Sequence, residues 1–201
     1  MGKHPRLIAV TGGIGSGKSV ICRMLEVKGF RVYDCDSEAR RLMERDPAIQ
    51  NRITSEICRD GINADGSLNR RNIAEVVFSQ QEMLEKLNAI VHGAVLADID
   101  RWRRANDREE LLFVETAILY QSGLDRMVDE VWEVDAPEDI RISRAMLRDG
   151  AQREAVTARV KAQCFVPERR HPLVSVIIND GSHPVLPRIN SLLQSCEIAD
   201  S

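Results

Sequence analysis

The chain has 201 residues, of which 43% are hydrophobic and 29% are charged, and its formal net charge is −3 at pH 7. This length suits one α/β core with modest insertions, and the slightly negative charge gives no global support for a nucleic-acid partner. No apolar run is long enough to span a bilayer, and the 5 cysteines form no C-x-x-C pair, which argues against a zinc knuckle and a disulfide framework. Because residues 1–6 leave no room for a signal peptide, we expect a cytoplasmic protein with reduced thiols and no membrane partner.

The first predicted strand, Leu7–Val10, precedes a glycine-rich segment and an amphipathic helix. Residues 12–19 spell G-G-I-G-S-G-K-S, the G-x-x-x-x-G-K-S pattern of a phosphate-binding loop. Glycines let several backbone N–H groups point at one anion, and the helix N-terminus adds partial positive charge. Lys18 is expected to reach the β- and γ-phosphates, and the Ser19 hydroxyl to ligate Mg²⁺. The alternative is a chance glycine-rich turn, but the flanking strand and helix favour a nucleoside triphosphate site.

After the first helix, segments with strand patterns alternate with helical ones. Such alternation predicts a parallel, doubly wound sheet that binds ligands at the carboxyl ends of its strands. Polar residues follow several of these strands directly, and they include Asp34, Asp36, Glu115 and Asn179. The further strands are expected at residues 31–34, 111–115, 128–134 and 174–178.

The helices have start and stop signals in the sequence. Ser37 is expected to cap the helix after the second strand, and Pro47 to open a helix that ends near Cys58. From Arg70 the chain is strongly helical, although His92-Gly93 could interrupt the amphipathic stripe. The remaining helices are expected from Pro137 to Gly150, from there to about Phe165, and after Pro184 and Pro187.

A small kinase is the class of phosphate-loop protein that the rest of the chain favours. No N-K-x-D base-reading motif of a switch GTPase is present, and the chain is short for a motor ATPase. A kinase needs a carboxylate near the acceptor hydroxyl and a mobile basic lid. Asp36 is the candidate carboxylate, unless it is a solvated turn residue or a helix cap. Arg144 and Arg148, four residues apart on one helix face, can grip phosphate oxygens, unless they only form an exposed basic surface.

An ordered series of motifs resembles the dephospho-CoA kinase family over about residues 7–193. The phosphate loop is followed by D-C-D at residues 34–36, where the family usually has D-A-D. The series continues with DGSLNR at 65–70, LNAIVH at 87–92, RAMLRD at 144–149, Arg159 with Ala162-Gln163, and VIINDG at 176–181.

This resemblance implies ATP-dependent phosphorylation of the ribose 3′-hydroxyl of dephospho-CoA, with Mg²⁺, by a monomer or weak homo-oligomer. It implies a P-loop nucleotide-kinase-like α/β fold, with a five-stranded parallel sheet flanked by helices. The expected core comprises residues 1–60, 107–143 and 171–201. A helical acceptor-binding domain is expected at 61–106 and a lid at 144–170.

The resemblance also implies roles for individual residues. Asp36 matches the catalytic base, and Lys18 and Arg144 match the residues that stabilise the transferred phosphate. Arg70 and His92 match acceptor-domain positions, although each could be purely structural. Glu115 matches an acidic strand end that holds a Mg²⁺-bound water or only satisfies nearby backbone. The residues expected to contact ATP are Gly13, Gly15, Ser16, Gly17, Lys18, Ser19, Val20, Arg144, Arg148, Asn179 and Gly181.

Some positions depart from the family pattern. Val20 replaces the usual Thr, but the backbone N–H remains available for the phosphate. Gly93 replaces a Pro, which relaxes a kink instead of fixing it. Gln121 stands where Glu is common, so an essential carboxylate there is not expected. Leu173-Val174 and Phe165-Val166-Pro167 also differ, and they affect the lid more than the phosphate site.

Overall fold

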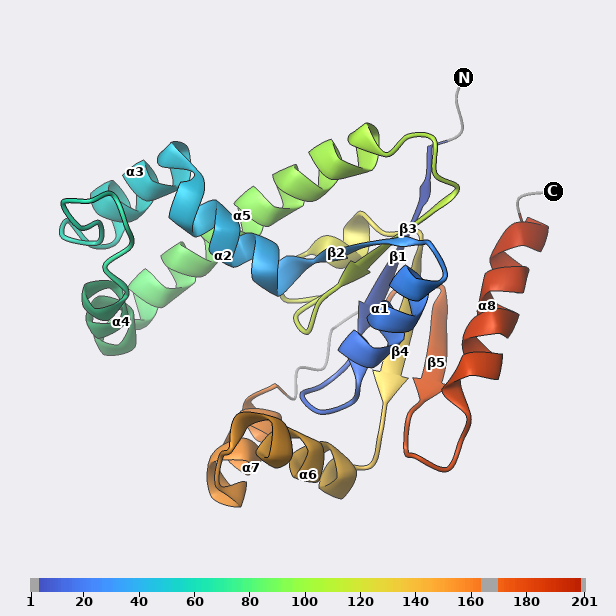
Figure 1. The fold of residues 1–201 in the computed structure, drawn as a ribbon. Helices are drawn as coiled ribbons and strands as arrows, with labels where there is room; N and C mark the ends of the chain where they lie inside the picture. Colours follow the sequence, from blue (N-terminus) through green and yellow to red (C-terminus); the bar gives the residue numbers. More distant parts are fainter. Residues whose placement is uncertain (1–3, 164–169, 200–201) are drawn as a thin grey trace. The chain divides into compact units, whose positions relative to one another are not determined.

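The computed structural model describes residues 4–163 and 170–199 (Figure 1). Two compact units are distinguished, one formed by residues 1–33 and 107–201 and the other by Asp34–Asn106. We call the first the sheet unit and the second the helical unit. Cys164 and the expected lid residues 165–167 lie outside the described part of the chain. No described helix combines the length and apolar character needed to cross a membrane.

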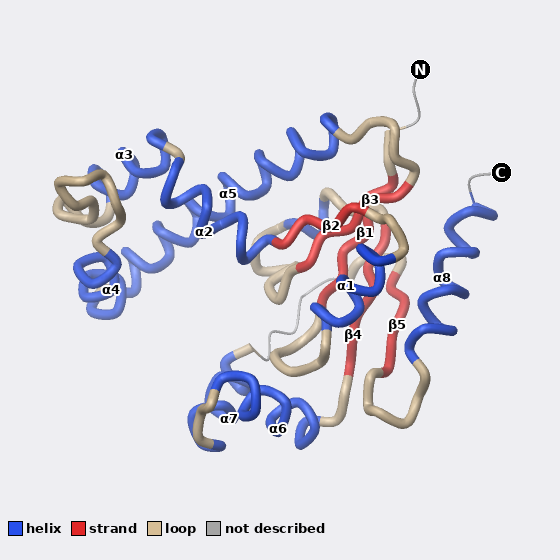
Figure 2. The backbone as a smooth tube through the Cα atoms, viewed as in Figure 1, coloured by secondary structure: helices blue, strands red, loops and turns tan. Residues whose placement is uncertain are grey.

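A five-stranded sheet forms the centre of the sheet unit (Figure 2). Its strand order is β2-β3-β1-β4-β5, and β1 pairs in parallel with β3 and β4, as β4 does with β5. This arrangement confirms the predicted parallel, doubly wound sheet. The strands are β1 (Arg6–Thr11), β2 (Arg31–Asp34), β3 (Leu111–Glu115), β4 (Glu130–Asp135) and β5 (Val174–Ile178).

Apolar side chains on one face of the sheet pack against helices α1 (Lys18–Val27) and α8 (Val185–Ala199). Phe113 of β3 lies between Phe30 and Trp132, with ring centroids 5.4 Å and 5.2 Å away. Trp132 and Phe113 are fully buried, so these aromatic contacts help to anchor the central strands. The last helix begins earlier than expected, because Pro187 is accommodated in its first turn, where few backbone N–H groups have intrahelical partners.

Two helices, α6 (Glu138–Asp149) and α7 (Arg153–Ala162), form a hairpin between β4 and β5. Gly150 ends α6 with φ of 61°, in the left-handed region that favours glycine. The hairpin has its own small core of Ile142, Ala145, Val156 and Val160. We call these two helices, together with the capping residues Gln152 and Gln163 of α7, the lid hairpin.

The helical unit consists of α2 (Cys35–Arg45), α3 (Pro47–Glu56), α4 (Arg70–Ser79) and α5 (Gln81–Ala105). The other three helices all contact α5. The unit is therefore larger than the expected range 61–106, because α2 and α3 also pack on α5. Helix α5 is continuous through His92 and Gly93, so the possible interruption there does not occur.

The predicted cap of α2 is wrong. The N-cap is Asp34 rather than Ser37, and its carboxylate accepts hydrogen bonds from the backbone N–H groups of Asp36 and Ser37. Both side chains are good caps, but the helix begins directly after β2, which leaves Ser37 in the first turn. The Ser37 hydroxyl donates to Asp34 at 2.6 Å instead.

Candidate active site

The phosphate loop joins β1 to α1, at the carboxyl end of a central strand. Gly12, Gly15 and Gly17 have φ of 146°, 75° and 98°. A Cβ on Gly12 would lie 2.2 Å from the carbonyl oxygen of Val134, and a Cβ on Gly15 would lie 2.1 Å from that of Arg141. Only glycine therefore allows the loop to curl this tightly against its neighbours.

Polar groups of the loop are arranged for an anion. The Lys18 ammonium donates to the carbonyl of Gly12 at 2.8 Å, so it lies across the loop. The Ser16 hydroxyl is fully buried and has no hydrogen-bond partner among the described residues. Helix α1 begins without a side-chain cap and without an acidic residue in its first turn. These features fit a triphosphate, because they leave donors and the positive end of the helix dipole at the loop.

Ser19 and Glu115 place two side-chain oxygen groups next to each other beside the loop. The Ser19 hydroxyl donates to the Glu115 carboxylate at 2.7 Å, which links α1 to the end of β3. Hydroxyl and carboxylate oxygens suit Mg²⁺, which uses few protein ligands together with phosphates and water. Among the described residues, no cluster of three or more His, Cys, Asp or Glu side chains could hold a metal by itself.

Cys22 lies one turn further along α1 and is buried. Burial raises the pKa of its thiol, and the nearby charge of Glu115 raises this pKa further. The thiol is therefore protonated at neutral pH.

Arg144 and Asn179 meet beside the phosphate loop. Arg144 Nη1 donates to the backbone carbonyl of Asn179 at 2.7 Å. The Asn179 side-chain amide donates to the carbonyl of Ser16 at 2.8 Å. The structure thus brings together three predicted residues from the lid hairpin, the end of β5 and the phosphate loop. Gly181, two residues further on, has φ of 88° in the turn that follows β5.

Arg148 is placed differently from Arg144. Its guanidinium donates to Asp149 at 2.7 Å, and Arg159 of α7 donates to the same carboxylate at 2.7 Å. These two arginines lower the pKa of Asp149 to about 2. In this structure Arg159 therefore links α7 to α6, whereas Arg148 pairs with its neighbour in α6, and its predicted contact with ATP stays a prediction.

Asp36, Arg70 and His92 belong to the helical unit. Asp36 is exposed in the first turn of α2, directly after β2. Arg70 begins α4 and forms an ion pair with Glu44. His92 is half-buried on α5, and burial lowers the pKa of its imidazole. The roles of these three residues toward an acceptor stay predictions.

Two residues at the phosphate loop are not among those predicted to form the site. Arg141 Nε donates to the carbonyl of Ile14 at 3.1 Å, and Gln163 Oε1 accepts the backbone N–H of Ile14 at 2.8 Å. The sequence offers one signal for each: Gln163 belongs to a family motif, and Arg141 lies three residues before Arg144. Neither signal identifies the phosphate loop as the partner.

Three of the positions that depart from the family pattern have exposed side chains in the sheet unit. Val20 is 52% exposed, so its side chain is not needed for packing. Gln121 is exposed in the turn after β3, and Leu173 is exposed just before β5. These positions leave the contacts of Lys18 and Ser19 described above unchanged.

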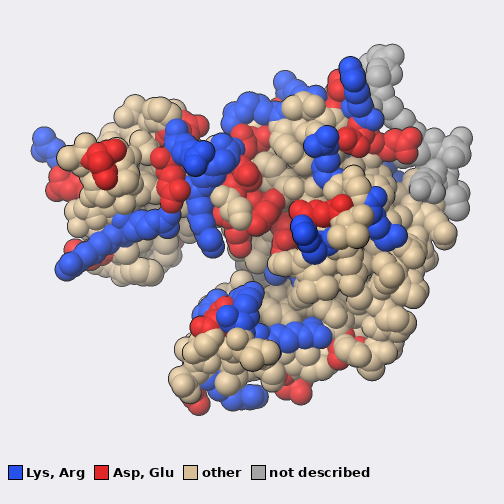
Figure 3. Space-filling view, viewed as in Figure 1, with Lys and Arg blue, Asp and Glu red and all other residues tan. Residues whose placement is uncertain are grey.

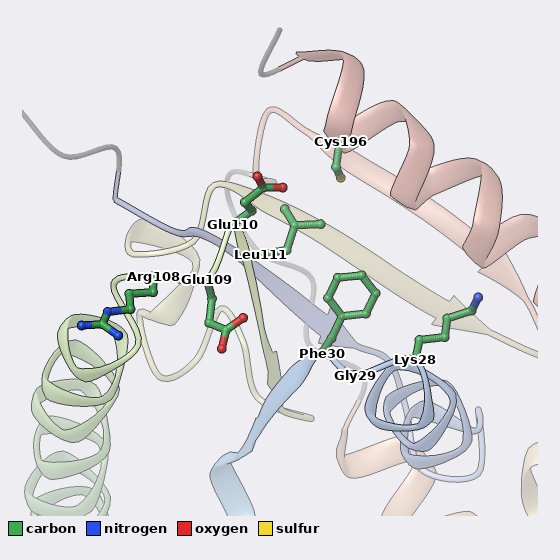
Figure 4. Close-up of a pocket in the computed structure, with 8 residues that line it drawn as sticks. All are labelled: Lys28, Gly29, Phe30, Arg108, Glu109, Glu110, Leu111 and Cys196. Atoms are coloured by element: carbon green, nitrogen blue, oxygen red, sulfur yellow. The ribbon is translucent and has the colours of Figure 1, made fainter.

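A separate pocket of about 390 Å³ opens at the end of the sheet where β3 begins (Figure 4). It is lined by residues before β2, by residues before and at the start of β3, and by one residue of α8. Since β1 and β3 are parallel, the start of β3 lies at the end of the sheet opposite the phosphate loop, which follows β1. The lining residues are Lys28, Gly29, Phe30, Arg108, Glu109, Glu110, Leu111 and Cys196.

Basic side chains gather over the lid hairpin on the face drawn in Figure 3, with acidic ones interspersed. This local charge contrasts with the net charge of −3 of the whole chain. A basic lid beside an anion-binding loop is the distribution that transfer of a phosphoryl group requires.

Comparisons with known proteins agree with this geometry. The family model for dephospho-CoA kinase matches residues 6–184. A dephospho-CoA kinase of Porphyromonas gingivalis is 37% identical over 193 residues, which cover 94% of this chain and 93% of the relative. Another, from Salinibacter ruber, is 38% identical over 177 residues, which cover 87% and 89%.

Solved structures extend the likeness to the fold. A Thermus thermophilus protein superposes with a TM-score of 0.77 at 33% identity, covering 99% of this chain and all of the other, 100%. A dephospho-CoA kinase from Campylobacter jejuni has a TM-score of 0.69 at 22% identity, covering 97% and 98%, and so shares the fold. The family match over most of the chain and these full-length relatives lead to one conclusion: this chain belongs to the dephospho-CoA kinase family.

Proposed function

We propose that this chain transfers the γ-phosphoryl group of ATP to the ribose 3′-hydroxyl of dephospho-CoA, giving CoA and ADP. The observation that supports this most strongly is the phosphate loop itself, with Lys18 across it and with Arg144 and Asn179 beside it, in a chain of this family. Family members are named for this reaction. The reaction is the last step of coenzyme A synthesis.

The residues of the sheet unit account for the handling of ATP. The loop amides and Lys18 bind the β- and γ-phosphates, and Arg144 stabilises the charge that spreads over the transferred group. Ser19, with Glu115 beside it, would hold Mg²⁺, which neutralises phosphate charge when bound. We assign the buried Ser16 hydroxyl to the phosphate side of the loop. A buried donor without a partner is unfavourable until a ligand accepts a hydrogen bond from it.

We assign residues of the helical unit to binding and orienting the acceptor. We assign Asp36 as the base that orients the 3′-hydroxyl and accepts its proton during attack on the γ-phosphorus. Arg70 would bind acceptor phosphate, exchanging its ion pair with Glu44 for a more highly charged partner. His92 is assigned a position next to the acceptor as a neutral side chain, because burial lowers its pKa.

We further propose that the protein acts in the cytoplasm as a monomer or weak homo-oligomer. Cys22, Cys35, Cys58 and Cys196 are buried, and no disulfide joins them, which supports a reducing compartment.

A coupled assay of ADP release tests the proposed function. With ATP and Mg²⁺ present, turnover should depend on added dephospho-CoA and saturate with it. Nucleoside monophosphates serve as competing acceptors. Turnover on a monophosphate with none on dephospho-CoA would assign another small acceptor, and turnover that no acceptor stimulates would indicate a nucleotide-dependent switch.

Substitution of the proposed base gives a second test. Asp36→Asn keeps the size of the side chain but removes the proton acceptor, so kcat should fall by about 100-fold or more. Binding of ATP, measured by calorimetry, should change little. Asp60→Asn makes the same chemical change at an exposed position of the helical unit and should leave kcat unchanged. A normal rate for Asp36→Asn would remove this residue from the mechanism.

A further inference from the structure

Ile14, at the tip of the phosphate loop, is held by the lid hairpin on several sides. Its backbone N–H donates to Gln163 Oε1 at 2.8 Å, and its carbonyl accepts from Arg141 Nε at 3.1 Å. Its side chain packs against the hairpin core. Both peptide groups that flank Ile14 are therefore fixed by side chains of the hairpin.

The guanidinium of Arg141 also lies against the neighbouring glycine. A Cβ on Gly13 would fall 2.5 Å from Arg141 Nη2, which is far closer than a van der Waals contact. The absence of a side chain at Gly13 thus makes room for Arg141. The backbone of Arg141 in turn contacts Gly15, where a Cβ would lie 2.1 Å from the Arg141 carbonyl oxygen.

Fixing this segment has a physical consequence for ATP binding. A loop rich in glycine has many backbone conformations when it is free, and ordering it opposes binding. Interactions that hold the loop in its binding conformation before ATP arrives remove part of this unfavourable entropy. Ile14 is flanked by Gly13 and Gly15, so its anchoring limits both of these flexible residues.

We propose that Arg141 and Gln163 are positioning residues that preorganise the phosphate loop for ATP by holding the Ile14 peptide groups. The lid hairpin then has a role in ATP affinity besides that of Arg144. This inference rests on the proposed function only in taking ATP as the ligand. It predicts that loss of either contact raises Kd and KM for ATP, with a smaller effect on kcat and none on KM for the acceptor.

Matched substitutions test the two contacts. Arg141→Met and Gln163→Met keep the apolar bulk but remove the hydrogen bonds, so each should raise KM for ATP about tenfold. Arg153→Met and Gln152→Met make the same changes at exposed positions of the lid hairpin and should keep KM within about twofold. Arg141→Gln retains an N–H donor and should restore part of the affinity. A lower Tm with normal KM would reduce both residues to a structural role and overturn the proposal.

A double-mutant cycle tests the contact with Gly13. The methyl group of Gly13→Ala should displace the Arg141 guanidinium, since this is the flexible end of a side chain. Gly13→Ala and Arg141→Met then remove the same interaction, and the double variant should bind ATP no more weakly than Gly13→Ala alone. Strictly additive effects on Kd would show that Arg141 does not act through the loop.

Amide hydrogen exchange of Ile14 gives a readout that needs no activity. In the ligand-free full chain, Gln163→Met should accelerate exchange of the Ile14 N–H by about fivefold to tenfold, while Gln152→Met leaves it unchanged. Equal exchange in wild type and Gln163→Met would overturn the proposal. If the methionine variant does not fold, Gln163→Ala is measured in its place with the same expectation. If the wild type lacks acceptor-dependent turnover but the exchange result holds, the proposed function fails while the positioning role stands.

Discussion

The glycines of the phosphate loop differ in what surrounds them, and this difference determines which substitutions the loop tolerates. Next to Gly15 lies backbone, the carbonyl of Arg141. Next to Gly17 lies a side chain, because a Cβ there would be 2.0 Å from Asn179 Nδ2. A side chain can rotate away but a backbone carbonyl in a packed helix cannot. The sequence pattern requires glycine at position 17 but not at position 15, whereas the tertiary contacts restrict Gly15 more than Gly17.

Gly15→Ala should therefore be a severe substitution. The added Cβ would meet the Arg141 carbonyl, and φ of 75° would be strained for alanine. We expect Kd for ATP to rise by about 100-fold or more, because the cradle cannot keep its shape. Gly29→Ala is the control, since Gly29 has φ of 94° but nothing within 4 Å of its Cβ position. It should lower Tm slightly and leave Kd unchanged. Near-normal ATP binding by Gly15→Ala in calorimetry would contradict this description of the loop.

At the scale of whole elements, the lid hairpin and α5 show two ways in which a helix is stabilised. The lid hairpin combines a small apolar core with charge, since Arg148 and Arg159 both donate to Asp149 at the end of α6 and keep it ionised. Helix α5 is held by packing along its length against α2, α3 and α4. The residue of α5 with the lowest helix propensity is Gly93, which is exposed. Glycine at this position loses more conformational entropy when the helix forms than alanine would.

Gly93→Ala should stabilise the protein. No atom lies within 4 Å of the Cβ position, and the residue lies inside a regular helix, so alanine adds helix propensity without a clash. We expect the free energy of unfolding to rise by about 0.5–1 kcal/mol. Ala97→Gly, the reverse change at another exposed position of α5, should lower it by a similar amount. Urea denaturation measures both, and a loss of stability in Gly93→Ala would mean that glycine is required at this site.

At the scale of the whole molecule, stability should depend on pH through His92. Burial lowers the pKa of His92 below its ordinary value of 6.5, so the folded state favours the neutral ring. Below pH 6.5 the unfolded chain binds the proton more readily than the folded chain does. The contribution of His92 is thus fully present above the unfolded pKa and is lost as the pH falls through the folded one. Stability is compared at about pH 7.5 and about pH 5.5, on either side of the ordinary histidine pKa of about 6.5. Between these two conditions the wild type should lose more stability than His92→Gln does. Equal losses in urea denaturation would contradict the effect.

The sequence predicts the architecture of the sheet unit well, because its determinants are local. Apolar strands alternating with amphipathic helices imply a parallel sheet, and G-x-x-x-x-G-K-S identifies the loop after β1. Lys18 lies across this loop and Ser19 contacts Glu115 at the end of β3, while their roles toward ATP and Mg²⁺ stay predictions. The cap of α2 was harder to predict, because Asp34 and Ser37 are both suitable and the end of β2 decides between them.

Features that depend on distant parts of the chain could not be predicted in this way. The extent of the helical unit depends on the packing of α2 and α3 against α5, which comes much later in the sequence. The contacts of Arg141 and Gln163 with Ile14 join residues that lie 127 and 149 positions apart. Periodicity and motif spacing contain no information about such pairs, since both describe neighbours along the chain.

The position of the new phosphate on the product tests the central claim most directly. Wild-type protein is incubated with ATP, Mg²⁺ and dephospho-CoA, and the purified product is examined by phosphorus and proton NMR. We expect a phosphomonoester coupled to the ribose H3′ proton, formed in equal amount to ADP. Release of inorganic phosphate together with ADP while dephospho-CoA stays unchanged, or a phosphate on any other hydroxyl of the acceptor, would contradict the proposed transfer.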